Sequence, residues 1–500
     1  MKNLDTIKLV VASFFALMMT SCSSGFLVEE PNTSLTEEEV YSDQESLQLL
    51  VAGLYTQWRD TRKDRSALYF TMGTDEAQQG GQQVQENNVQ AALDKYNGAL
   101  NPTNSVIAGE WNKRWPIVSA ASKAVFFAQT DQLSAEAAFL RAAVNFELAM
   151  LWGPIPIVEQ GNTLEARQPL ADVYNFIIRD LELAVEFLPI TQSDKRFPTK
   201  GAAEALLGKV YMYAPEESNV RDYQKALEYF DLAIPKYSLL PNYGDLFNTL
   251  LDQNSSEVIY GFQFNNIEPD NNQVQHQAGS RAVADVDANT YFGGYDLAVP
   301  TEYYHTDIWV GETGDTRKAA SIRENFVLPD GRVPTITWTN QPDELEPHTK
   351  KYEDIRTQGS QNFWYSGGMI YFLRLGDILL NKAECLNELG RTGEAIQLVN
   401  STVRARAFGG TLPDENAWVN MSQDEFRDNM LDERMRELAF EGWRRMDLIR
   451  TGNLIERVSE HNPWANESGT LQPFHVRYPI PESEIKQNQA INEEDQNPGY

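Results

Sequence analysis

The chain has 500 residues, of which 42% are hydrophobic and 23% are charged, a balance typical of globular proteins. Its formal net charge of −30 at pH 7 excludes nucleic acid as an expected partner, because such a surface repels phosphates. The two cysteines and five scattered histidines form neither a disulfide framework nor a metal-binding motif, so we expect no cofactor and no metal site.

The amino terminus predicts an exported, lipid-anchored protein. Lys2 and Lys8 precede the apolar run 9–20, which is too short to span a bilayer but suits the core of a signal peptide. Small residues then lead into Cys22, as in the lipobox of bacterial lipoproteins. We therefore expect residues 1–21 to be a signal peptide and Cys22 to be lipidated, for example with palmitate. An ordinary secretory signal that leaves a stray thiol is the alternative.

Helical periodicity dominates the first half of the mature chain. Ser42 and Glu45 have the spacing of a capping box, which predicts a helix through Trp58. Helical patterns follow at about 108–129 and 170–188. The strongest helix is predicted from Ser134, its expected N-cap, to Trp152, where Gly153 and Pro154 should end it. Its apolar residues cover much of the circumference, so we expect this helix to be buried.

Two helical pairs carry the spacing of tetratricopeptide repeats. Leu207-Gly208-x-x-Tyr211 matches the first helix of such a repeat, and Ala226-x-x-x-Phe230 matches the second. A second pair begins near Ala383. Recurring pairs predict a mainly α, tetratricopeptide-like helical core, which we place at about 36–240 and 366–460 within one domain covering 22–500.

Other stretches lack helical periodicity. Residues 73–104 are rich in Gln, Asn and Gly, which predicts a long loop. Residues 241–365 alternate like a strand at 258–264 and are otherwise rich in Asn, Gln, Gly and aromatic residues, so we expect a loop-rich excursion with short strands. The tail 478–500 contains Pro479 and Pro481 and is expected to be extended or turn-like.

Several of these segments resemble one family, the SusD/RagB outer-membrane lipoproteins. The matching sequences run in the family's order through nearly the whole mature chain: Cys22 with Phe26-Leu27, Thr74-Asp75-Glu76, Glu136 to Ala142 leading to Leu151-Trp152-Gly153-Pro154-Ile155-Pro156, Gly294, Pro300-Thr301, Tyr371 to Asp377, Glu433 to Arg445, Tyr478 to Pro481, and Asn497 to Tyr500.

The resemblance implies a cell-surface, non-enzymatic binding protein that is held to the outer membrane by its lipid. It implies oligosaccharide binding and delivery to a SusC-like TonB-dependent transporter. Peptide binding on the same scaffold, as in RagB-like members, is the first alternative, and an exported glycoside hydrolase is the second.

Two loop zones have the chemistry of a sugar site, namely flat apolar surfaces beside amides and carboxylates. The family's ligand contacts come from loops in these general zones, although no residue-level motif transfers. The candidate contacts are Asp75, Gln79, Tyr96 and Asn97 in the first zone, and Tyr291, Trp309 and Trp338 in the second.

The acidic residues between Asp432 and Asp447 raise the hydrolase alternative. They alternate with arginines, so we interpret them as an ion-paired network and not as a catalytic pair. Asp285 and Asp287 lack the glycine and terminal glutamate of a calcium loop, which makes calcium a weak expectation.

Overall fold

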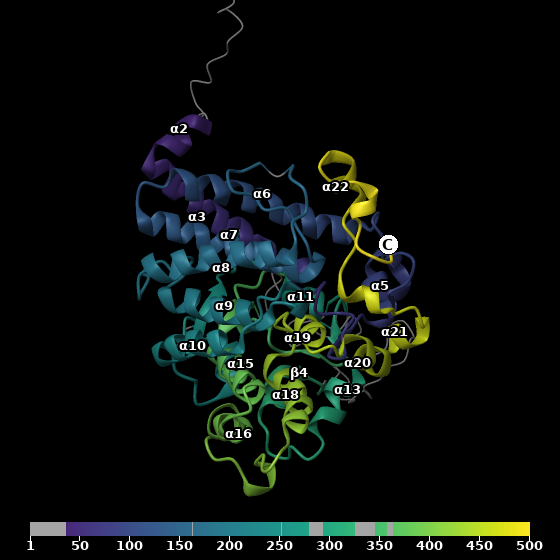
Figure 1. Ribbon diagram of the computed structural model, residues 1–500. Coiled ribbons are helices and arrows are strands. Elements are labelled where there is room, and N and C mark those ends of the chain that lie inside the picture. The colour runs from purple at the N-terminus through teal and green to yellow at the C-terminus, as the bar shows by residue number, and fades with distance from the viewer. Residues whose placement is uncertain (1–36, 163, 252, 280–293, 326–345, 358–363) are drawn as a thin grey trace, which may run out of the picture.

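Stacked helices form the framework of the protein, whose computed structural model describes residues 37–500 except 163, 252, 280–293, 326–345 and 358–363. The stack runs down one side of the molecule (Figure 1) and consists of α3 (Gln44–Asp60), α6 (Ser105–Phe127), α7 (Asp131–Trp152), α8 (Leu170–Phe187), α9 (Lys200–Tyr213), α10 (Tyr223–Ala233), α15 (Leu375–Glu388) and α16 (Thr392–Val399). Successive helices from α6 to α10 pack against one another, and α10 then packs on α15. The predicted mainly helical fold is confirmed.

Shorter elements complete the described chain. The remaining helices are α2 (Glu37–Ser42), α4 (Gly81–Glu86), α5 (Asn88–Lys95), α11 (Val274–Ala278), α13 (Glu302–His305), α14 (Arg317–Ser321), α17 (Ala405–Ala407), α18 (Gln423–Leu438), α19 (Arg444–Arg450), α20 (Leu454–His461), α21 (Pro463–Ser468) and α22 (Glu482–Gln487). Three antiparallel strand pairs join β1 (Ala77–Gln78) to β3 (Val299–Pro300), β2 (Val258–Phe262) to β6 (Ile370–Arg374), and β4 (Ile322–Arg323) to β5 (His348–Thr349).

The predicted repeat spacing reflects close helix packing. A Cβ added at Gly208 of α9 would lie 2.5 Å from the ring of Phe230 on α10, so only glycine lets these two helices approach so closely. Cys385 is buried in α15.

Helix α7 is buried along its length, as its two apolar stripes predicted. Its N-cap is Thr130, whose side chain accepts a hydrogen bond from the backbone N–H of Leu133, so the prediction of Ser134 as N-cap was wrong by one turn. Gly153 ends the helix with φ +79°. A side chain there would collide with Arg477, which places the carboxyl-terminal tail directly against this turn.

Three other local predictions need correction. Helix α3 is capped by Asp43, which accepts a hydrogen bond from the N–H of Ser46, and not by Ser42. Residues 73–104 form β1, α4 and α5 instead of one long loop, because Asn87 caps α5 and its alanines favour helix. The tail also contains a short helix, α22, which begins directly after Pro481.

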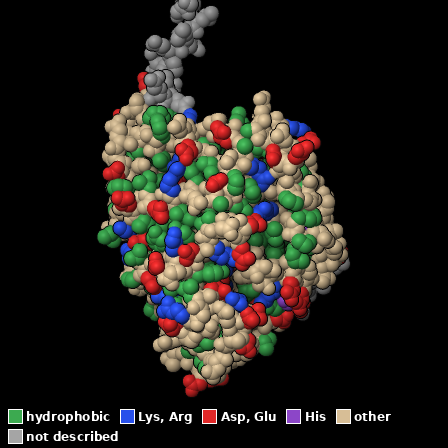
Figure 2. Space-filling view, viewed as in Figure 1, with side chains coloured by type: hydrophobic (Ala, Val, Ile, Leu, Met, Phe, Trp, Pro, Cys, Tyr) green, Lys and Arg blue, Asp and Glu red, His purple; other side chains and the backbone are tan. Residues whose placement is uncertain are grey.

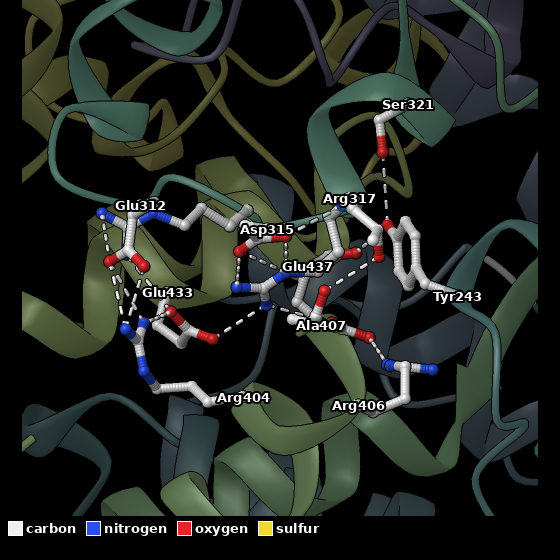
Figure 3. A network of polar contacts seen from close by, with 12 residues as sticks. Tyr243, Glu312, Asp315, Arg317, Ser321, Arg404, Arg406, Ala407, Glu433 and Glu437 are labelled. Carbon is white, nitrogen blue, oxygen red and sulfur yellow. Dashed lines mark hydrogen bonds and ion pairs between the residues drawn. The ribbon is translucent and has the colours of Figure 1, made fainter. Parts of the chain in front are cut away.

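A buried ion network holds the loop-rich segment 307–323 against α18. Figure 3 shows its residues converging from α14, α17 and α18. Glu437 accepts hydrogen bonds from three arginine side chains, those of Arg317, Arg374 and Arg406. Glu433 likewise pairs with Arg317 and Arg404. Both glutamates have no exposed side-chain area.

A capping box formed by Ser422 and Glu425 opens α18. Farther along, Arg434 pairs with Asp377 of α15 and with Asp447 of α19, both below 3 Å. The prediction of an ion-paired network at 432–447 is therefore confirmed. These carboxylates are held by arginines within the protein, so they do not form an open catalytic pair.

The outer surface mixes the two signs of charge. Figure 2 shows acidic and basic side chains interspersed with apolar ones on the face it displays. Among the described residues, no helix is both long enough and apolar enough to cross a bilayer.

Candidate ligand-binding site

The structure brings the two predicted loop zones together. Strand β1 pairs with β3 in the register Ala77↔Pro300 and Gln78↔Val299. On one side of this pair, the hydroxyl of Thr301 donates to the backbone oxygen of Asp75 at 2.6 Å. On the other side, the N–H of Gly80 donates to the backbone oxygen of Asp296 at 2.8 Å. The region around residues 75–80 and 296–301 is hereafter the β1–β3 site.

The carboxylate of Asp75 anchors this site to α19. It forms a bidentate ion pair with Arg444, whose Nε lies 2.7 Å from Oδ1. Both side chains are at most 1% exposed. Charge-assisted bidentate pairs of this kind fix geometry as well as contributing energy.

Glu76 carries the most perturbed carboxyl of the site. Burial raises its pKa to about 8, although the N–H of Phe440, which donates to Oε1 at 2.9 Å, and the charge of Arg444 both act in the opposite direction. The Glu76 side chain is therefore largely protonated at neutral pH, and it links the site to the segment that follows α18.

Asp94 at the end of α5 ties three segments together. Its carboxylate accepts hydrogen bonds from the backbone N–H groups of Gly73 and Gln79 and from the side-chain amide of Asn462. Burial raises the pKa of Asp94 to about 6, against the effect of these three bonds. Such a fully bonded buried carboxylate gives the site a rigid base.

Three of the predicted contact residues lie in the interior. Asp75 and Gln79 are 0% exposed, and Tyr96 is 1% exposed. Tyr96 donates its hydroxyl proton to the backbone oxygen of Gly73 and accepts a hydrogen bond from Arg445. In this conformation Asp75 and Tyr96 support the walls of the site, because their polar atoms already bond to the protein.

The other predicted contacts are more accessible or fall outside the described residues. Asn97 is half-buried and accepts a hydrogen bond from the N–H of Ala99. Trp309 is half-buried, and its indole N–H donates to the backbone oxygen of Tyr304 at 2.7 Å. Tyr291 and Trp338, together with Asp285 and Asp287, lie outside the described residues.

Buried amides without partners gather at the β1–β3 site. Within the described ranges, neither amide atom of Gln79 has a hydrogen-bond partner, and the side-chain oxygens of Gln78 and Gln277 also lack one. Backbone bonds from Leu297 to Gln277 and from Gly80 to Asp296 hold these segments side by side. A buried polar group without a partner costs about 1–3 kcal/mol, so these amides are suited to a polar ligand.

Sequence reasoning missed several residues of the site. Gln78 and Gln277 were not singled out, although the glutamine-rich composition around both positions was a usable signal. Tyr303 stacks on His461 with ring centroids 3.7 Å apart, and the indole N–H of Trp464 donates to the backbone oxygen of Gln79. The local sequence does not reveal these contacts, because the residues that form them lie more than 150 positions apart.

Comparison with known proteins places this geometry in context. The family model described as "SusD family" matches residues 301–500, and the model described as "Starch-binding associating with outer membrane" matches residues 25–212. The SusD-like protein P2 of Formosa agariphila is 26% identical over 522 aligned residues, which cover 98% of this chain and 99% of that protein.

Two further relatives are informative. The starch-binding protein SusD of Bacteroides thetaiotaomicron is 24% identical over 75% of this chain and 74% of its own length. A solved structure described as a laminarin-binding SusD-like protein has a TM-score of 0.74 at 22% identity, covering 92% of this chain and 100% of that one, which shows a common fold. No cluster of His, Cys, Asp and Glu suited to a metal ion occurs in the part of the chain that the structure describes.

Proposed function

Because the chain belongs to the SusD/RagB family, we propose that it binds oligosaccharides at the cell surface and delivers them to a SusC-like TonB-dependent transporter. The observation that carries this proposal is the set of unpartnered buried amides at the β1–β3 site, where the two predicted loop zones meet. Amides can both donate to and accept from sugar hydroxyls, and the relatives named for starch and laminarin bind glycans.

We assign the ligand contacts to Gln79, Asn97 and Trp309 and to the aromatic residues Tyr291 and Trp338. Asp75 and Tyr96 act as positioning residues, since their polar atoms are engaged by Arg444, Gly73 and Arg445. The protein binds its ligand without hydrolysing it. The acids of α18 support this, because arginines hold them in the interior.

Replacement of Trp338 by alanine tests the site. We expect this variant of the soluble chain 23–500 to bind laminari- or malto-oligosaccharides about tenfold more weakly, since one aromatic platform contributes on the order of 1 kcal/mol beyond the area it buries. The melting temperature should change little. Titration calorimetry with each oligosaccharide series measures the effect.

Phe126→Ala is the matched control, because Phe126 is 59% exposed on α6 and lies outside the site. An equal affinity loss in this control, or a large thermal loss for Trp338→Ala at unchanged affinity, would contradict the assignment. Binding of a peptide pool in place of every glycan would identify a peptide carrier, and release of free sugar would identify a hydrolase.

Membrane attachment is tested separately at Cys22. We expect the wild-type protein to incorporate radiolabelled palmitate and to sediment with outer membranes, whereas Cys22→Ala should do neither. Cys385→Ala is the control, since that thiol is buried in α15 and cannot be acylated in the folded protein. Membrane association and label incorporation that survive in Cys22→Ala would refute the lipid anchor.

A further inference from the structure

A separate cavity of about 90 Å³ lies between the carboxyl-terminal half of α7, strand β6 and the segment 441–443. Phe440 and Arg444 bind Glu76 and Asp75 of the β1–β3 site, whereas the residues between them line the cavity. The two sites therefore lie on different sides of the segment 440–444. Its lining includes Arg62, Ala67, Phe70, Arg114, Glu147 and Trp443.

Two guanidinium groups and one carboxylate form its charged wall. Glu147 is paired within the protein, because it accepts hydrogen bonds from Trp58 and Arg62 at Oε1 and from Arg114 at Oε2. Both arginines keep further N–H donors. Among the described residues, the hydrogen bonds of Arg62 start at Nη1 and Nη2 and those of Arg114 start at Nε and Nη1, which leaves Nε of Arg62 and Nη2 of Arg114 for another acceptor. These N–H groups can therefore serve an acceptor that enters the cavity.

The positive charge of Arg62 is the less compensated of the two. Burial lowers the pKa of Arg62 below its ordinary value, and the nearby charge of Arg114 adds to this effect, so the ion pair with Glu147 does not fully offset them. The pKa of Arg114 is instead raised, because Glu147 and Glu110 together outweigh its desolvation. An anion beside Arg62 would supply the missing compensation.

The rest of the wall is mostly aromatic and apolar. Phe70, Phe372 and Trp443 line the cavity, and the Arg62 guanidinium lies 5.7 Å from the ring centroid of Phe372. The second carboxylate of the lining, Glu441, is neutralised by Arg374 and Lys351. Gly442, which also lines the cavity, is exposed to solvent. The combination of free guanidinium N–H groups with aromatic walls fits an anion that has a flat or short apolar body.

We propose that this cavity binds a small carboxylate whose body is a single ring. A volume of about 90 Å³ accommodates roughly six water-sized groups, enough for the carboxylate and the adjacent part of one ring. The ring can belong to a sugar acid or to an aromatic acid, since both present a carboxylate to Arg62 and Arg114. The proposal goes beyond glycan delivery and does not depend on the β1–β3 site.

Matched ligand pairs test the proposal on the soluble chain 23–500. Glucuronate is compared with glucose, and benzoate with benzyl alcohol, by calorimetry and by tryptophan fluorescence, in about 0.15 M salt, which screens the net negative charge beyond ~8 Å. We expect the carboxylate of at least one pair to bind about tenfold or more tightly than its neutral partner. Binding of glucuronate alone indicates a sugar acid, and binding of benzoate alone indicates an aromatic acid.

Two variants locate the binding. Arg62→Met should abolish the preference for the carboxylate. Ala67→Leu should block the cavity while keeping both guanidinium groups, so it remains informative if Arg62→Met folds poorly. Arg179→Met is the control, because Arg179 is an exposed ion-paired arginine on α8. The proposal is overturned if neither carboxylate binds below about 10 mM, if the neutral partners bind equally well, or if Ala67→Leu binds like the wild type.

Discussion

Glu437→Gln is expected to destabilise the protein by about 3–5 kcal/mol, the typical result of leaving a buried charge uncompensated. Arg374, Arg406 and Arg317 all donate to this single carboxylate, which has no exposed side-chain area. Glutamine keeps the shape but removes the negative charge, and its amide N–H₂ group faces the arginines. Urea denaturation followed by tryptophan fluorescence measures the change.

The same substitution should change the acid sensitivity of folding. Burial alone would raise the pKa of Glu437. The charges of Arg406, Arg374 and Arg317 outweigh this effect and hold that pKa well below its ordinary value of 4.5. The unfolded chain therefore takes up a proton at a higher pH than the folded chain does, and this part of the stability is lost as the pH falls below about 4.5. We expect the difference between wild type and variant to be constant above about pH 5 and to shrink as the pH falls from about 5 to 3.

Glu394→Gln is the matched control for Glu437→Gln. Glu394 of α16 is also paired with an arginine, Arg391, which directly precedes this helix, but both side chains are exposed. Exposed pairs contribute little to stability because water and salt screen them. A similar loss of stability in both variants, or a difference that is independent of pH, would show that the buried charge of Glu437 is not the cause.

Sequence predictions that depend on contacts between residues close in the chain were accurate, whereas those that depend on tertiary contacts were less so. Helix α8 was predicted to within one residue, because its apolar period is set by neighbours in the same helix. The repeat spacing correctly placed Gly208 in the first helix of a pair, and α9 and α10 approach each other closely at this glycine. The N-caps of α3 and α7 were each misplaced, because several residues near each helix start can cap and only the tertiary contacts select among them.

Burial of polar residues was the main feature that the sequence did not reveal. Asp75, Gln79 and Tyr96 lie in a polar stretch that resembles an exposed loop, yet all three are buried. Their partners, Arg444, Trp464 and Arg445, are 349 or more positions away in the chain. A periodic pattern contains no information about such pairs, so the zones of the site could be predicted but not the orientation of its side chains.

Arg444→Met is expected to have the largest effect on the β1–β3 site. The variant would leave the carboxylate of Asp75 buried, with Arg457 at 4.0 Å as the nearest remaining cation among the described residues. We expect a loss of about 3–5 kcal/mol in unfolding free energy. Because segment 73–80 would lose its anchor on α19, glycan affinity should fall and amide exchange at Gly73 and Gln79 should accelerate.

A double-mutant cycle separates the ion pair from general damage. Once Asp75→Asn has removed the charge, Arg444→Met should cost less than it does alone, and the coupling should be about 2–3 kcal/mol. Arg427→Met is the control, since Arg427 lies on α18 with 43% of its side chain exposed and pairs with Glu388 and with the exposed Asp424. Additive effects of Asp75→Asn and Arg444→Met would mean that this pair does not hold the site together. The segment that Arg444 anchors carries Gln79, a proposed ligand contact. If Arg444→Met bound glycan as tightly as the wild type, the ion pair between Arg444 and Asp75 would therefore not contribute to ligand binding.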